Sequence, residues 1–339
     1  MKKYPHDVLG GDVMNSKSKK IIPIIFIVIA LILPLIIKST YVILLFNFMG
    51  LYMISVSGLD LLFGYTGQIS LGHAAFYGIG AYTTAILTTK FGVPAILAVF
   101  FSLFVAAVFG ILLAVPACKL VGHFLALLTI AFGQLFYQFV ANFSSISGGF
   151  SGINFIPEIS FFGLELNTNV HYFYFILVLV IMALYIKQAI VHSSYGRSLI
   201  AIRENIHAAD GAGVNVVSRK ISVFAISAVF TALTGSIYAC MVGFISPETF
   251  TQNQSIIFLT MLLLGGMGHF IGPLLGAVIV TIIKEYLQGF GTYQMLIYGL
   301  IIIVVVLFAP NGLVGLYGSI KEKLRQRKRR GTDGKAVPQ

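Results

Sequence analysis

The polar side chains best suited to chemistry lie in residues 64–82, Gly-Tyr-Thr-Gly-Gln-Ile-Ser-Leu-Gly-His-Ala-Ala-Phe-Tyr-Gly-Ile-Gly-Ala-Tyr. This stretch places amide, hydroxyl and imidazole groups at Gln68, Ser70 and His73, between segments that are almost entirely apolar. Hydrocarbon cannot form hydrogen bonds, so polar groups at membrane depth must be buried in protein or line a polar cavity. The stretch therefore predicts a place where a polar solute crosses a membrane.

Two interpretations of these polar side chains remain open. They line a pathway, or they form hydrogen bonds between helices, which contribute about 0.6 kcal/mol each on average. The candidate pathway residues are Gln68, Ser70, His73 and, from a later apolar segment, Gln134. Hydroxyls and amides of this kind suit a neutral or zwitterionic solute.

The residue pattern indicates a transport protein rather than an enzyme. The 7 histidines are scattered without a metal-ligand spacing, and no phosphate-binding G-x-x-x-x-G-K-[ST] loop occurs. Cys118 and Cys240 are too far apart in sequence to indicate a metal site, and we expect them to be packing residues. We expect no catalytic residue, no metal and no cofactor in this chain.

Composition predicts an all-α polytopic membrane protein. Of the 339 residues 58% are hydrophobic and 10% are charged, whereas soluble domains carry about 25% charged residues. The net charge of +11 is concentrated beside apolar segments, as topology signals are, which argues against nucleic-acid binding. The basic run near the C-terminus is suited to contact anionic membrane lipid.

About ten crossings are predicted, some of them short and broken by glycine. Apolar segments that could span about 20 residues lie near 21–37, 41–63, 69–89, 93–115, 120–142, 171–190, 220–244 and 291–310. Between 249 and 287 a glycine-rich turn, Gly265–Pro273, separates two short crossings. With ten crossings both termini are cytoplasmic, and all but three of the 22 Lys and Arg residues lie on that side. The exceptions are Lys38, Lys90 and Lys284.

The predicted organisation is a single transmembrane domain between two basic ends. Residues 1–20 form a cytoplasmic N-terminus, 21–317 the transmembrane domain, and 318–339 a cytoplasmic tail. The domain has an external loop at 144–170 and an internal loop at 188–219. Charged residues are expected at segment ends, and Asp60 comes closest to an exception.

The sequence also predicts a close contact between helices, from small residues, and a short helix in the internal loop. Gly268, Gly272 and Gly276 repeat every four residues, which allows close helix approach, either within this chain or to another subunit. In the internal loop, residues 200–209 contain good helix formers, and Gly211 and Gly213 are stop signals. That helix either contacts a cytoplasmic partner or only connects two crossings.

Several stretches in order resemble the LivM-type permeases of branched-chain amino-acid ABC importers. The stretches are Gly64–Tyr82, Phe124–Gln134, Ser147–Ile153, Gly196–Asn205, Gly243–Phe250 and Leu264–Pro273. The resemblance covers roughly residues 40–315. This chain departs from the family pattern at Asp210-Gly211, where relatives usually have Glu-Ala.

The resemblance implies the partners and a coupling role for the internal loop. The partners would be a LivH-type second permease, two cytoplasmic ATPases that bind ATP and Mg, and an extracytoplasmic solute-binding protein, in a bacterial cell membrane. The residues expected to couple to an ATPase are Arg203, Glu204, Asn205, Ala208, Ala209 and Gly213. One alternative is an importer of the same architecture that carries urea, short amides or other amino acids. Another alternative is a stand-alone secondary carrier, which the lack of charged residues in the middle of the apolar segments disfavours.

Overall fold

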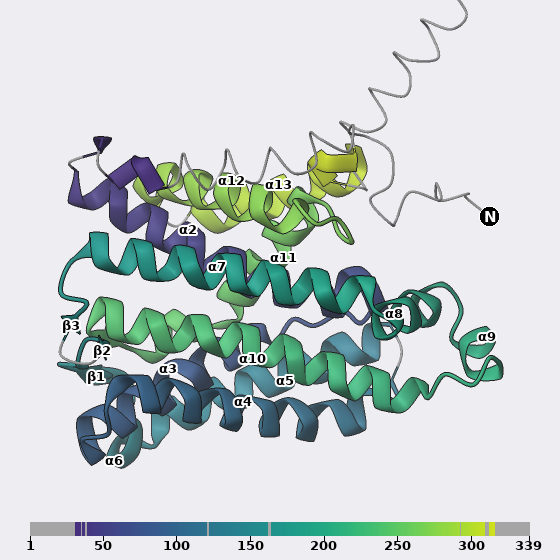
Figure 1. The fold of residues 1–339 in the computed structure, drawn as a ribbon, viewed down its shortest axis with the longest axis horizontal. Coiled ribbons are helices and arrows are strands. Elements are labelled where there is room, and N and C mark those ends of the chain that lie inside the picture. Colours follow the sequence, from purple (N-terminus) through teal and green to yellow (C-terminus); the bar gives the residue numbers. More distant parts are fainter. Residues whose placement is uncertain are drawn as a thin grey trace, which may run out of the picture.

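The computed structural model describes residues 31–315, except 35, 38, 121, 162–163, 292 and 309–311. The predicted basic ends and most of the predicted first crossing lie outside these residues. The described part is built almost entirely of helices, which run side by side along the long axis of Figure 1. The all-α prediction is therefore confirmed for the described residues.

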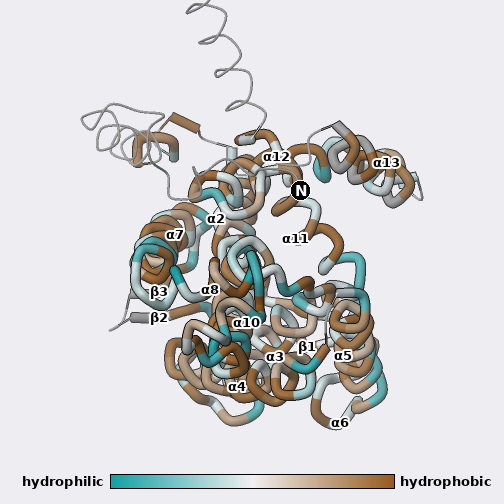
Figure 2. Tube along the Cα trace, turned by 90° about the vertical axis from the view of Figure 1, so that its right-hand side faces the viewer, coloured by the Kyte–Doolittle hydropathy of each residue, from teal (hydrophilic) through white to brown (hydrophobic). Residues whose placement is uncertain are grey.

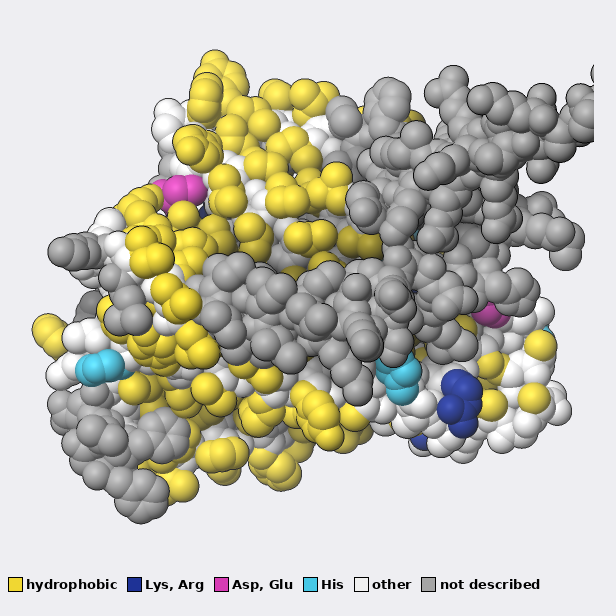
Figure 3. Space-filling view, turned by 45° about the horizontal axis from the view of Figure 1, so that its top comes forward, with side chains coloured by type: hydrophobic (Ala, Val, Ile, Leu, Met, Phe, Trp, Pro, Cys, Tyr) yellow, Lys and Arg dark blue, Asp and Glu magenta, His cyan; other side chains and the backbone are white. Residues whose placement is uncertain are grey.

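Nine longer helices form the bundle in the described residues. They are α2 (Thr40–Leu59), α3 (His73–Phe91), α4 (Ala95–Ala117), α5 (His123–Asn142), α7 (Asn169–His192), α10 (Val216–Val242), α11 (Gln252–Gly265), α12 (Gly272–Leu287) and α13 (Tyr293–Phe308). Within the described part, 5 segments are long and apolar enough to cross a membrane. Hydrophobic side chains cover much of the surface in Figure 3, as expected for a lipid-facing protein. The number of crossings and the side of the termini stay predictions.

Short elements close the end of the bundle opposite the internal loop. They are α6 (Ser144–Ser147), the 3-10 helices η3 (Gly149–Ser151), η4 (Pro247–Phe250) and η5 (Gln288–Phe290), and the strands β1 (Ile153–Asn154), β2 (Ser160–Phe161), β3 (Leu164–Glu165) and β4 (Phe244–Ile245). Strand β1 pairs antiparallel with β4, and β2 with β3. Residues 147–152 form a tight turn within the predicted external loop, since Gly148 has φ +77° and a Cβ there would lie 2.0 Å from the Gly152 carbonyl oxygen.

Helix α10 forms the centre of the bundle. It packs against α2, α3 and α4, and Figure 2, which views the helices nearly end on, shows it among them. Its approach to α3 is close because both helices have glycine at the contact. A Cβ on Gly235 would lie 1.8 Å from the Tyr77 carbonyl oxygen, and one on Gly80 would lie 2.0 Å from that of Ala232.

Helices α11 and α12 form a short hairpin, as the glycine-rich turn predicts. A Cβ on Gly276 would lie 1.7 Å from the Met261 carbonyl oxygen, and one on Gly272 would lie 2.1 Å from that of Gly266. These two glycines therefore serve close packing within this chain, which decides between the two interpretations of their spacing. Gly268 lies in the turn itself, with φ +72°.

We predict that Gly235→Val lowers the free energy of unfolding by about 1–3 kcal/mol, because the new side chain must push α3 away from α10. Gly299→Val is the matched control, since nothing lies within 4 Å of a Cβ at Gly299. Unfolding by SDS titration measures both variants. Equal stability of the two would contradict the close approach of α3 and α10.

Candidate functional site

The polar stretch after α2 is irregular backbone buried in protein. Residues 67–72, between α2 and α3, are not helical. Gln68 is 5% and Ser70 is 1% exposed, which confirms that this stretch avoids lipid. The Leu71 N–H donates to Thr129 Oγ1 of α5 (3.0 Å), and Gln252 Nε2 of α11 donates to the Leu71 carbonyl (2.9 Å). Neighbouring helices thus supply the hydrogen bonds that the irregular backbone lacks.

His73 connects this stretch to the central helix. Its Nδ1 lies 2.8 Å from Ser70 Oγ and its Nε2 lies 2.7 Å from Ser227 Oγ of α10. Gln68 Nε2 donates to Thr66 Oγ1 (3.2 Å). The structure therefore brings Ser70 and His73 together in hydrogen bonds between segments. Their role in a solute pathway stays a prediction, as does that of Gln134, which lies apart on the exposed face of α5.

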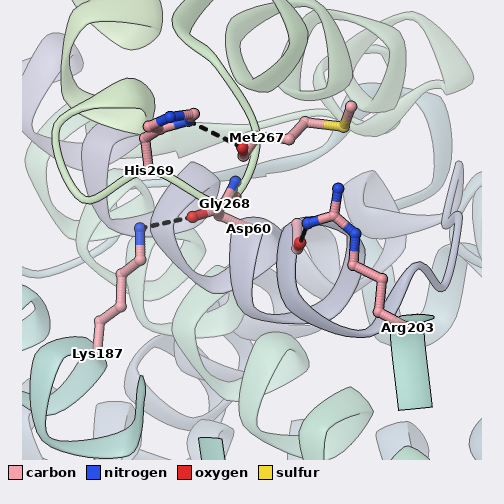
Figure 4. A network of polar contacts seen from close by, with 7 residues as sticks. Asp60, Lys187, Arg203, Met267, Gly268 and His269 are labelled. Atoms are coloured by element: carbon pink, nitrogen blue, oxygen red, sulfur yellow. Dashed lines mark hydrogen bonds and ion pairs between the residues drawn. The ribbon is translucent and has the colours of Figure 1, made fainter. Parts of the chain in front are cut away.

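A buried network of polar contacts lies around Asp60, at the end of α2 nearest to α8 (Ser194–Glu204) (Figure 4). Asp60 Oδ2 lies 2.7 Å from Lys187 Nζ of α7, and neither side chain is exposed. Asp60 Oδ1 accepts a hydrogen bond from the Gly268 N–H (2.7 Å) in the α11–α12 turn. One buried carboxylate therefore holds α2, α7 and the glycine-rich turn together.

A π-helical turn, η2 (Asp60–Gly64), positions this carboxylate. It continues α2 by one wide turn, a rare geometry that occurs often at functional sites. A Cβ on Gly64 would lie 2.0 Å from Asp60 Oδ1 and 2.7 Å from the Gly268 nitrogen. Only glycine at position 64 leaves room for the Asp60 contacts.

Lys187 lies near the end of α7, where charged residues are expected, but it is not at a solvated surface. This lysine lies inside α7, 0% exposed, and pairs with Asp60. A buried carboxylate is stable only with a cation and hydrogen bonds, because desolvation of a lone charge costs several kcal/mol. Asp60 near an apolar segment was a signal that could have indicated such a partner, but the sequence did not predict the ion pair.

Arg203 connects the internal loop to the same place. It belongs to α8 (Ser194–Glu204), and its Nη1 donates to the Gly64 carbonyl of η2. Helix α8 is held against α10 by Tyr195, whose hydroxyl lies 2.6 Å from Ser222 Oγ. Arg219 stacks over the Tyr195 ring, 4.7 Å from its centroid. Burial raises the pKa of Tyr195 above its ordinary 10.0, so the hydroxyl stays protonated and hydrogen-bonded at neutral pH.

The prediction of one helix over 200–209 is wrong in its bounds. The loop contains α8 and a second helix, α9 (Ile206–Gly211), separated at Asn205. The Asn205 side chain accepts hydrogen bonds from the His207 and Ala208 N–H groups, and such a cap starts a new helix. The predicted stop is confirmed at Gly213, which has φ +83°.

The predicted coupling residues divide into two groups. Glu204, Asn205, Ala208 and Gly213 lie on the surface, whereas Ala209 is only 3% exposed. Arg203 is partly buried and its guanidinium is directed inward to Gly64. The surface group is available to a partner, and the other two residues hold the loop on the bundle.

Comparison with known proteins places the chain among transport permeases. Residues 40–306 match the family described as branched-chain amino acid transport system / permease component. The chain belongs to this family. The high-affinity branched-chain amino acid permease proteins LivM of Salmonella typhimurium and Escherichia coli are each 30% identical over 287 residues, 78% of this chain and 68% of theirs.

Relatives with lower identity or coverage include a further LivM protein and a permease named for a different solute. A probable LivM of Methanocaldococcus jannaschii is 22% identical over 313 residues, 78% of this chain and 90% of its own. An autoinducer 2 import permease, LsrC of Yersinia enterocolitica, is 27% identical over 174 residues, 48% of this chain and 47% of its own. No solved structure matches.

We predict that Lys187→Met destabilises the permease by about 3–5 kcal/mol, because it leaves the Asp60 charge buried without a cation. The double variant Asp60→Asn/Lys187→Met should recover most of this loss, since it removes both charges. SDS-titrated unfolding of each purified variant provides the measurement.

Lys119→Met is the control, because Lys119 is exposed just after the end of α4. Its free energy of unfolding should stay within about 0.5 kcal/mol of the wild type. A double variant as unstable as Lys187→Met would show that the ion pair is not the source of the loss.

Proposed function

We propose that this chain is a permease subunit of an ATP-binding-cassette importer for the branched-chain amino acids leucine, isoleucine and valine. The similarity to two LivM proteins over 78% of the chain is the observation that carries the proposal. The chain would form the pathway with a LivH-type permease in a bacterial plasma membrane. Two cytoplasmic ATPases would bind ATP and Mg, and an extracytoplasmic binding protein would deliver the solute.

The internal loop supports contact with an ATPase. Helix α9 exposes Ala208, and the chain after it forms a groove of about 350 Å³. The groove lies where α9 meets α10, between Asp210 and Val217. A short exposed helix beside a groove is a surface that a partner can engage. We assign ATPase contact to Glu204, Asn205, Ala208 and Gly213.

The Asp60 contacts provide a route from this loop into the membrane. Arg203 of α8 bonds to the Gly64 carbonyl, and Asp60, one turn earlier, bonds to Gly268 and Lys187. Because Asp60, Gly64 and Lys187 are buried, each lost contact would leave an unpaired polar group. A shift of the loop should therefore carry the inner end of α2 and the glycine-rich turn with it.

Helix α5 supports a pathway between two permeases. Gln134, Gln138 and Asn142 are exposed on it and recur every four residues, so they share one face. Only 22% of the apolar window of α5 is buried. Gln138 and Asn142 bond to each other, whereas the Gln134 amide would lack a hydrogen-bond partner if it faced lipid. This favours a second subunit over this face and a solute passing along it.

We predict ATP-dependent uptake of leucine when this chain is reconstituted in liposomes with its partner permease, ATPases and binding protein. Uptake should be competed by isoleucine and valine but not by urea, because the proposed solute is an amino acid. Radiolabelled leucine inside the vesicles is the measured quantity. Uptake of urea in preference to leucine would refute the proposal that the solute is an amino acid. Leucine flux through this chain alone would refute the proposal that the chain is an importer subunit.

The same assay separates the coupling surface from the rest of the loop. Ala208→Glu should reduce uptake at least about tenfold, because a charge at the contact is costly to desolvate. Ser194→Glu is the control, since it adds the same charge at an exposed position at the start of α8. Equal uptake by both variants would show that α9 does not contact the ATPase.

A further inference from the structure

A large cavity lies within this one chain, away from the internal loop. Its volume is about 950 Å³, within the range of small-molecule sites. Glu248 of η4, just after the outer end of α10, and Lys284, near the end of α12, both line it. The cavity therefore lies in the half of the bundle opposite α8 and α9.

The walls of the cavity combine aromatic rings with charges of both signs. Tyr52, Tyr77 and Tyr238 line it from α2, α3 and α10. Lys284 lies 5.9 Å from the centroid of the Tyr52 ring and forms no ion pair among the described residues. Glu248 is exposed in η4 and brings a carboxylate to the same cavity.

Two buried polar groups in the wall lack hydrogen-bond partners in the described part of the chain. They are Tyr77 Oη and Gln254 Nε2, and the residues are 1% and 7% exposed. A buried donor without an acceptor is costly, and native proteins have few. Both groups can donate a proton, so with the Lys284 ammonium they suit a negatively charged acceptor in the cavity.

A zwitterion matches this set of groups better than a neutral or singly charged ligand. Its carboxylate would accept from Tyr77, Gln254 and Lys284, and its ammonium would lie near the Glu248 carboxylate and the tyrosine ring faces. The apolar part of the lining includes Leu45, Phe48, Ile256 and Ile257. That part suits a branched aliphatic side chain. Urea carries no charge that could pair with Lys284 or Glu248.

We propose that this cavity is a binding site for a free zwitterionic α-amino acid inside this single subunit, distinct from a pathway between two permeases. The zwitterion chemistry rests on the cavity alone. The choice of a branched amino acid rests also on the proposed function. The site gives this subunit its own contact with the solute, so specificity does not depend only on a binding protein.

Equilibrium binding of radiolabelled leucine to the purified permease–ATPase complex in nanodiscs, without binding protein, tests the site. The wild-type complex should bind leucine saturably. Tyr77→Phe should weaken binding about tenfold through loss of one hydrogen bond, and Lys284→Met at least about tenfold through loss of the charge. Unlabelled isoleucine should displace the leucine, and urea should not.

Matched control variants exclude general effects on folding. Tyr82→Phe removes another buried hydroxyl of α3 without a hydrogen-bond partner in the described residues, but Tyr82 does not line the cavity. Lys90→Met removes another lysine from the same end of the bundle. Both controls should bind leucine with affinity within about twofold of the wild type.

The outcomes separate this site from the proposed function. The site would be overturned if both Tyr77→Phe and Lys284→Met bound leucine with wild-type affinity. It would also be overturned if the wild type retained a phospholipid in the cavity that leucine cannot displace. A complex that imports leucine but binds none without its binding protein would also overturn it. A complex that imports no leucine but binds another zwitterionic amino acid through Lys284 would overturn only the proposed function.

Discussion

The carboxylate of Asp60 is the constraint on which the half of this permease next to α8 and α9 depends. It has no contact with solvent, so its charge must be balanced by groups of the protein. Lys187 of α7 and the Gly268 N–H of the α11–α12 turn supply that balance. The wide turn of η2 and the absence of a side chain at Gly64 follow from the same requirement. Three segments far apart in sequence are positioned by one side chain.

Polar residues elsewhere in the bundle serve the same structural purpose. His73 links irregular backbone to α10 through Ser70 and Ser227. The glycines of α3 and α10 allow backbones to approach where larger residues would collide. Other polar groups lie on the exposed face of α5 and in the walls of the cavity lined by Tyr77, Gln254 and Lys284. We propose that a solute meets the protein at these two places.

The sequence predicted elements that depend on local pattern. Apolar length predicted the long helices, and the glycines of 265–273 predicted the break between α11 and α12. It did not predict the ion pair with Lys187, because contacts between distant segments leave no local pattern. It placed one helix over 200–209 because helix propensity there is high, whereas the Asn205 side chain caps a new helix. Arg203 was expected at a partner surface, and its inward bond to Gly64 depends on a π-helical turn that no sequence pattern indicated.

The most direct test is whether the internal loop and the glycine-rich turn move as one unit. Spin labels at His207 of α9, which is exposed, and at Phe270, in a chain whose Cys118 and Cys240 are replaced by alanine, report the distance between them by double electron–electron resonance. In the complete importer we expect one narrow distance that is the same with and without ATP, and a broad distribution when Arg203→Gln removes the bond to Gly64. A wild-type distance that changes with ATP, or a narrow distance that Arg203→Gln leaves unaltered, would contradict the connection through Arg203 and Asp60.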